Sequence, residues 1–134
     1  MKNLVAIVLS LFASVALAAD PLSPETVNGA TTVDTAQAKA LFENGAAFVD
    51  TRKDSDWEAG RIPGAIHLEL KSAFTREALA AEVQSGDKVV FYCNGFSCLR
   101  SSESAAKAVE WGYTNVFYFR EGFPAWQAAG NPVE

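Results

Sequence analysis

Cross-linking and metal-binding side chains are scarce in this chain of 134 residues. It contains two cysteines, a single histidine, and methionine only at position 1. Two cysteines are too few for a disulfide-rich scaffold, and one histidine leaves little from which to build a metal site. We therefore predict no metal site and no cofactor.

Basic residues are also in the minority. The chain has 11 lysines and arginines against 16 aspartates and glutamates, for a formal net charge of −5. A protein with this balance repels the phosphates of nucleic acids and the headgroups of anionic membranes. The composition therefore argues against either as a partner.

The amino terminus has the pattern of a secretion signal. Met1 and Lys2 precede an uncharged, mostly apolar stretch at 4–17, and Ala16-Leu17-Ala18 then supplies a small-x-small cleavage pattern. The alternative is an uncleaved membrane anchor, but the stretch is shorter than the ~20 apolar residues of a spanning helix. We predict cleavage after Ala18 and a periplasmic or secreted protein that is not held at a membrane.

The remaining 116 residues are enough for one domain but not for two. Cleavage removes Lys2 and no acid, so the formal charge becomes −6. Residues 19–30, rich in Pro, Ser, Thr and Gly, are predicted to form an extended leader. The domain itself is expected to span residues 31–134.

Short apolar runs alternate with amphipathic segments along this domain. Strands are predicted at Val33, 47–49, 65–68, 89–92 and 116–119, and helical segments at 35–43 with Asp34 as N-cap, 54–59, 74–83 and 101–111. Such alternation predicts an α/β domain of three layers, in which a parallel β-sheet is flanked by helices through right-handed crossovers.

Cys93 is the candidate nucleophile. It ends the apolar run Val89–Tyr92 and begins a short loop that leads into the helix predicted at 101–111. Backbone N–H groups and the positive end of the helix dipole would surround its sulfur, and such surroundings lower a thiol pKa from ~8.5 into the range of roughly 3.5 to 7.5. This placement predicts a reactive thiolate.

Charged side chains follow the other strands at the same edge of the sheet. Asp50 and Arg52 come after one strand and Arg120 after another, while Arg100 lies in the Cys93 loop. Three arginines near a thiolate predict a small anionic substrate, because guanidinium groups bind oxyanions with paired hydrogen bonds. Asp50 is either a site residue or an acceptor that ties loops together. We favour the acceptor role, since a carboxylate beside the thiolate would raise the thiol pKa.

Several segments resemble the sequence boxes of the rhodanese family. The resemblance covers about the last hundred residues. Its boxes are Phe48–Arg52 with the Asp-x-Arg pattern, Gly60–His67 with Arg61 in place of the usual His, the Cys93 loop, and the closing segments Gly112–Tyr118, Gly122–Trp126 and Gly130–Val133.

The resemblance implies a single-domain sulfurtransferase that carries sulfur as a persulfide on Cys93. A small anionic donor such as thiosulfate would supply the sulfur, and a thiol or cyanide would accept it. No side-chain base is required, and we interpret His67 as a structural residue at a strand edge. The implied substrate-binding loop comprises Asn94, Gly95, Phe96, Ser97, Cys98, Leu99, Arg100 and Ser101.

The loop departs from the family pattern in length. Typical rhodaneses have an arginine five residues after the cysteine, and the related cell-cycle phosphatases and arsenate reductases have one at six, whereas Arg100 comes seven after Cys93. The spacing predicts a wider or bulged loop. Gly95 is suited to the sharp turn that this needs, because glycine adopts positive φ without steric cost.

Cys98 leaves two alternatives open. It is either a resolving thiol, which takes up the sulfur or closes a disulfide on Cys93, or a small apolar residue that seats the loop on the helix. We expect a disulfide to require reshaping of the loop, because a loop wrapped around an anion holds its side chains splayed. An exposed thiolate outside the cytosol also implies a reductant, for which a thioredoxin-like protein is a candidate.

Two other functions therefore stand beside the sulfurtransferase. One is a periplasmic thiol-disulfide or persulfide relay that uses Cys93 and Cys98. The other is a noncatalytic rhodanese-like binding module, which is disfavoured because the loop cysteine is present.

Overall fold

The computed structural model describes residues 22–134. The predicted secretion signal at 1–18 and the first residues of the predicted leader lie outside this part of the chain. Within residues 22–134, no helix combines the length and the hydropathy that crossing a bilayer would require.

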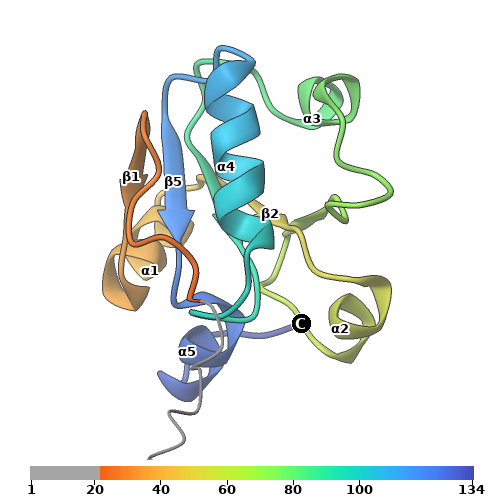
Figure 1. The fold of residues 1–134 in the computed structure, drawn as a ribbon. Coiled ribbons are helices and arrows are strands. Elements are labelled where there is room, and N and C mark those ends of the chain that lie inside the picture. The colour runs from red at the N-terminus through yellow and green to blue at the C-terminus, as the bar shows by residue number, and fades with distance from the viewer. Residues whose placement is uncertain (1–21) are drawn as a thin grey trace, which may run out of the picture.

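A parallel β-sheet forms the centre of the molecule (Figure 1). Its strand order is β1-β5-β4-β2-β3, and every neighbouring pair is parallel. Residues on β4 are buried on both faces, which explains why this strand is apolar at every position. The strands are β1 (Ala30–Thr32), β2 (Ala47–Asp50), β3 (Ile66–His67), β4 (Val89–Tyr92) and β5 (Val116–Phe119).

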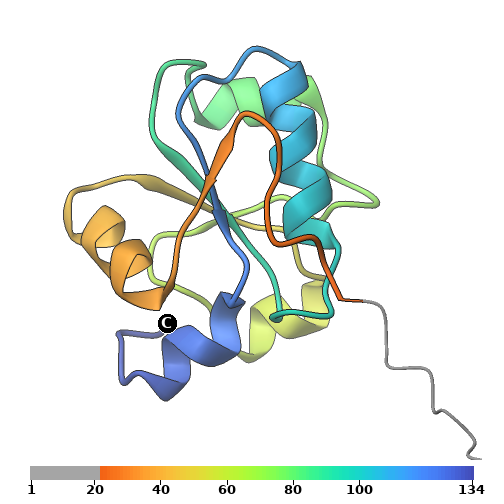
Figure 2. The ribbon, with the colours of Figure 1, turned by 60° about the vertical axis from the view of Figure 1, so that its left-hand side comes forward.

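Helices cover both faces of this sheet, as predicted for a three-layer α/β domain (Figures 1 and 2). One face packs against α3 and α4, and the other against α1 and α5. The helices are α1 (Thr35–Glu43), α2 (Asp54–Ala59), α3 (Arg76–Glu82), α4 (Arg100–Glu110) and α5 (Gly122–Ala128).

Local capping explains where two of these helices begin. The Asp34 side chain accepts a hydrogen bond from the Gln37 backbone N–H at 2.8 Å, and the Gln37 side chain accepts one from the Asp34 N–H at 2.9 Å. This capping box starts α1 at the predicted residue. Helix α3 begins two residues after the predicted Phe74, because Phe74 is buried in the core and Thr75 is the N-cap, with its Oγ1 accepting from the Ala78 N–H at 3.1 Å.

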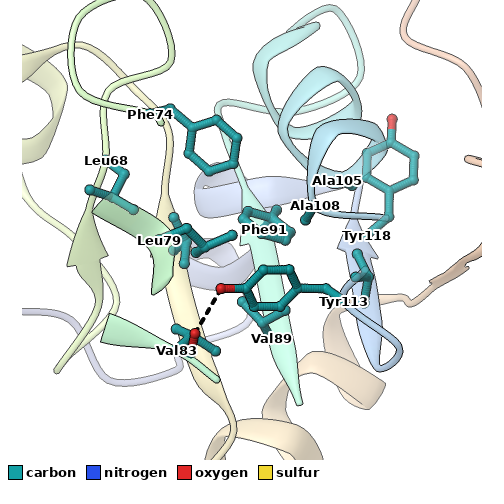
Figure 3. Close-up of a cluster of buried hydrophobic side chains, with 12 residues drawn as sticks. Leu68, Phe74, Leu79, Val83, Val89, Phe91, Ala105, Ala108, Tyr113 and Tyr118 are labelled. Carbon is teal, nitrogen blue, oxygen red and sulfur yellow. Dashed lines mark hydrogen bonds between the residues drawn. The ribbon is translucent and has the colours of Figure 1, made fainter. Parts of the chain in front are cut away.

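The core has two parts because alternate residues of each strand point to opposite faces. Figure 3 shows the part beneath α3 and α4, where Phe91 of β4 lies among Leu79, Ala105 and Ala108 and the Tyr113 hydroxyl donates to the Val83 carbonyl oxygen at 2.7 Å. The other part lies beneath α1 and α5. Its buried members include Phe48, Val90, Phe119 and Trp126.

The described part of the predicted leader packs against the domain. Ser23 is 3 % exposed, and the Tyr118 hydroxyl donates to the Pro24 carbonyl oxygen at 2.9 Å. In Figure 2 this segment runs beside the turn that precedes α4. Residues 23 and 24 are therefore part of the folded structure, although they precede the predicted domain boundary.

Candidate functional site

The Cys93 loop lies at the carboxyl end of the sheet. Cys93 directly follows β4, and α4 begins at Arg100, one residue before the predicted start. The predicted order of strand, loop and helix is confirmed. In parallel α/β sheets, ligands bind at the carboxyl ends of the strands, so the position of Cys93 suits a chemical role.

Cys93 and Cys98 are joined by a disulfide. Their Cα atoms are 6.2 Å apart, which lies within the usual range of about 4.4–6.8 Å for disulfides. The expectation that the loop holds these two side chains splayed is therefore wrong for this structure. The arrangement agrees with the alternative in which Cys98 closes a disulfide on Cys93.

A turn inside the loop brings the two cysteines together. The Cys98 N–H donates to the Gly95 carbonyl oxygen at 3.0 Å, and Gly95 has a φ of 110°. A positive φ of this kind is accessible to glycine without steric cost. Gly95 therefore makes the predicted sharp turn, and the turn folds the second half of the loop back over the first.

The first half of the loop is anchored to the start of α5. The Phe123 N–H donates to the Cys93 carbonyl oxygen at 2.8 Å. A Cβ atom on Gly122 would lie 2.3 Å from that oxygen and 2.8 Å from the Gly95 nitrogen, so only glycine permits this approach. Sequence reasoning placed Gly122 in a family box but did not foresee its contact with the loop.

The second half of the loop is anchored to the amino-terminal segment. The backbone N–H and the Oγ of Ser23 both donate to the Phe96 carbonyl oxygen, each at 2.7 Å. The sequence analysis missed Ser23, because a serine in a polar leader has no local signal of a contact made 73 residues away.

Arg120 supports this anchor and does not point to a free anion site. Its Nε donates to Ser23 Oγ at 3.1 Å, and its Nη2 donates to the Ser23 carbonyl oxygen at 2.7 Å. The guanidinium also lies 4.9 Å from the centre of the Phe96 ring. The predicted role of Arg120 as an anion ligand is corrected to that of a structural partner of Ser23.

Arg100 also donates its hydrogen bonds to acceptors within the protein. Its Nη1 donates to a carboxylate oxygen of Glu69 and to the Thr51 carbonyl oxygen, the latter at 3.2 Å. Hydrogen bonds from Arg100 and Ser72 lower the pKa of Glu69 to about 2. Arg100 therefore pairs with Glu69, and no pattern in the sequence identifies this partner.

Asp50 and Arg52 form a buried ion pair. Asp50 is fully buried and Arg52 is 3 % exposed. Asp50 accepts from Arg52 Nη2 at 2.7 Å, from Arg52 Nε, and from the Tyr92 hydroxyl at 2.7 Å. Burial and the neighbouring Asp50 carboxylate raise the pKa of Tyr92 well above its usual range. These contacts agree with the role of hydrogen-bond acceptor, in which Asp50 joins Arg52 to the end of β4.

Arg52 reaches the Cys93 loop through one contact. Its Nη1 donates to Asn94 Oδ1 at 3.3 Å, while its Nη2 donates to the Gly60 carbonyl oxygen at 2.6 Å. The expectation that Arg52, Arg100 and Arg120 converge on the thiolate is thus corrected. Each guanidinium is held by an acceptor of the protein, and for the buried Arg52 an unpaired charge would be strongly destabilising.

His67 lies at the sheet edge, as predicted. Its Nε2 is 2.8 Å from the Arg52 carbonyl oxygen, and its ring is stacked on Trp57 with centroids 4.6 Å apart. These contacts give His67 a structural role and do not require a catalytic one.

The two cysteines differ in accessibility. Cys93 is 1 % exposed, whereas Cys98 is half-buried. Two apolar residues of the same loop project into solvent near it, Phe96 at 49 % and Leu99 at 42 % exposed. A reagent approaching from solvent therefore meets Cys98 before Cys93.

Similarity to known proteins agrees with this architecture. The sequence profile of the Rhodanese-like domain matches residues 34–129. The thiosulfate sulfurtransferase GlpE of Pseudomonas syringae pv. syringae is 37 % identical over 93 residues, which cover 68 % of this chain and 81 % of that protein.

A second relative is much longer than this chain. The HTH-type transcriptional regulator Rv0324 of Mycobacterium tuberculosis is 31 % identical over 87 residues, which are 65 % of this chain but 37 % of the regulator. Among solved structures, the BH2092 protein of Bacillus halodurans superposes with a TM-score of 0.69 at 21 % identity, covering 78 % of this chain and 77 % of that one. The profile match and the similarity to GlpE show that this chain belongs to the rhodanese-like domain family.

Proposed function

We propose that the reduced form of this protein is a sulfurtransferase that carries sulfane sulfur as a persulfide on Cys93. The observation that carries the proposal is the place of Cys93, directly after β4 and in the loop that leads into α4. The similarity to a thiosulfate sulfurtransferase over 68 % of the chain supports it.

The reaction follows from a thiolate in this position. The Cys93 thiolate attacks the sulfane sulfur of thiosulfate, the sulfur–sulfur bond of the donor breaks, and sulfite leaves with the electron pair. An acceptor thiolate or cyanide then attacks the outer sulfur, and Cys93 leaves as a thiolate. Backbone N–H groups of the loop and the positive end of the α4 dipole favour the negative charge of both states.

Donor recognition is assigned to the loop backbone and not to the arginines. Arg100 is occupied by Glu69, and Arg120 by Ser23. The loop between Cys93 and the first turn of α4 also offers backbone N–H groups, and such groups are typical ligands of small oxyanions.

The disulfide corresponds to a resting form in which Cys93 is protected from oxidation. A dithiol reductant such as a thioredoxin-like protein would return it to the reduced form. We also propose that the protein acts in the periplasm or outside the cell, where disulfides persist. Cell fractionation of the full chain in a bacterial host tests this, and recovery of uncleaved protein in the cytoplasm would overturn it.

Mass spectrometry of the intact protein tests the sulfurtransferase directly. The reduced Cys98→Ser variant, freed of reductant and treated with thiosulfate, should gain the mass of one sulfur atom, and the Cys93→Ser variant should gain none. Equal behaviour of the two variants would contradict the role of Cys93. Loss of thiosulfate reactivity in all forms would favour a noncatalytic binding module.

A relay of thiols and disulfides is the second candidate. The Cys93–Cys98 disulfide favours it, because such a relay needs this pair. Equilibration with glutathione buffers tests the relay, because a labile or catalytic pair has a potential above roughly −300 mV, whereas a lower potential is typical of a structural disulfide and would contradict the relay.

A further inference from the structure

The disulfide shows that the Cys98 sulfur can reach the Cys93 sulfur within the folded chain. We infer that Cys98 discharges the Cys93 persulfide internally, so that the carried sulfur leaves as sulfide and the disulfide remains. This inference rests on the proposed function for the formation of the persulfide. It adds an activity to sulfur transfer, namely sulfide release without an external acceptor.

The loop is held on both sides in the geometry that the reaction requires. Phe123 binds the Cys93 carbonyl oxygen, and Ser23 binds the Phe96 carbonyl oxygen. The turn from Gly95 to Cys98 then brings the two cysteines close together. None of these hydrogen bonds involves a sulfur atom. Groups held this way react as if at very high concentration, with effective molarities that reach roughly 10⁵–10⁸ M in well-oriented intramolecular cases.

The reaction balances without an external oxidant. The Cys98 thiolate attacks Cys93 Sγ, the bond from Cys93 Sγ to the outer sulfur breaks, and the outer sulfur leaves with the electron pair as hydrosulfide, carrying a proton from the thiol or from water. The two cysteine sulfurs are oxidised to the disulfide, and the sulfane sulfur is reduced to sulfide. Attack on the outer sulfur would instead move the persulfide to Cys98, but the sulfur atoms joined in the structure are the two Sγ atoms.

Return to the reduced form then begins at Cys98. Cys93 is 1 % exposed, so an external thiolate reaches the half-buried Cys98 and forms a mixed disulfide there, while Cys93 leaves as a thiolate. A second thiol completes the reduction. The full cycle converts thiosulfate and two thiols into sulfite, hydrogen sulfide and one disulfide of the external thiol.

A single-turnover experiment tests the inference. The fully reduced protein, free of reductant and under anaerobic conditions, is mixed with thiosulfate in the absence of thiol and cyanide. We expect the wild type to release one sulfide per chain and to lose the mass of two hydrogens as the disulfide closes. The Cys98→Ser variant should keep its persulfide and release no sulfide.

Ser85→Ala provides the control, because Ser85 is an exposed serine in the turn between α3 and β4, at the opposite end of β4 from Cys93. It should behave like the wild type. A wild-type persulfide as long-lived as that of Cys98→Ser, or one found on Cys98, would overturn internal discharge and leave the proposed function intact. Absence of any persulfide in Cys98→Ser, together with absence of sulfide from the wild type, would instead overturn the proposed function.

Discussion

Ser23 holds the carbonyl oxygen of Phe96 with two hydrogen bonds, one from its backbone N–H and one from its Oγ, both at 2.7 Å. This contact joins the amino-terminal segment to the loop that carries both cysteines. It is reinforced by Arg120, whose guanidinium binds Ser23 and lies over the Phe96 ring. The loop is therefore stabilised by a residue outside the domain boundary expected from the sequence.

Substitution of Ser23 by alanine should destabilise the oxidised protein by about 0.5–1.5 kcal/mol, because one hydrogen bond is lost and Arg120 Nε loses its acceptor. Denaturant unfolding measures the change. Ser97→Ala is the control, since Ser97 is an exposed serine of the loop, and its effect should be near zero. Equal effects of the two substitutions would contradict the role of Ser23.

Substitution of Gly122 by alanine should be far more destabilising than substitution of Gly130. Both glycines have a positive φ, 69° and 75°, so both substitutions incur backbone strain of about 1–3 kcal/mol. Only at Gly122 would the new Cβ also meet backbone, at 2.3 Å from the Cys93 oxygen, whereas nothing lies within 4 Å of one at Gly130. Thermal unfolding of both variants tests this, and similar melting temperatures would contradict the close approach.

The pairing of Glu69 with Arg100 should make stability depend on pH in the acid range. The folded protein lowers the pKa of Glu69 from 4.5 to about 2, so the pairing contributes fully above about pH 4.5 and is lost as the pH falls toward 2. Glu69→Gln should remove this part of the dependence. Urea unfolding between pH 6 and pH 2.5 measures it, and we expect wild type and variant to differ by about 1.5–3 kcal/mol at pH 6 and to converge at low pH.

Arg100→Gln should leave thiosulfate binding nearly intact. The guanidinium is bound to Glu69 and Thr51, so we expect the KM for thiosulfate to change by less than about threefold while stability falls. Steady-state kinetics with cyanide as acceptor measures the KM. An increase of tenfold or more, without loss of folded protein, would restore Arg100 as a donor ligand.

Cys93→Ser should abolish sulfur transfer from thiosulfate to cyanide, whereas Cys98→Ser should retain a substantial part of it. The reason is that the transfer to cyanide uses only the persulfide on Cys93, and Cys98 is needed only for closure of the disulfide. Thiocyanate formation measures the activity of the reduced proteins. Comparable losses in both variants would show that the nucleophile is misassigned.

Local sequence determined most of the secondary structure. The bounds of α1 and α2 agree with prediction, because Asp34 caps the first and both end at strong helix-terminating residues near Asn44 and Gly60. The runs that form β4 and β5 were identifiable because strands buried on both faces are apolar throughout. The position of Cys93 between β4 and α4 follows from these neighbours alone.

The pairing of side chains around the loop was decided only by the tertiary structure. The partners of Arg100 and Arg120 are Glu69 and Ser23, which lie 31 and 97 residues away in sequence. A sequence shows that an arginine is near the edge of a sheet but not which acceptor it meets there. The three arginines were therefore expected to face the anion, whereas each is held by an acceptor of the protein.

The closure of the Cys93–Cys98 disulfide was also decided by the tertiary structure. Spacing allowed both an open and a closed loop, and the choice depends on backbone contacts from two distant segments, Ser23 on one side and Gly122 with Phe123 on the other. The sequence by itself determined that a cysteine stands where a strand meets a helix. The tertiary structure decided what that cysteine touches, because loop conformation is set by long-range contacts and not by local propensity.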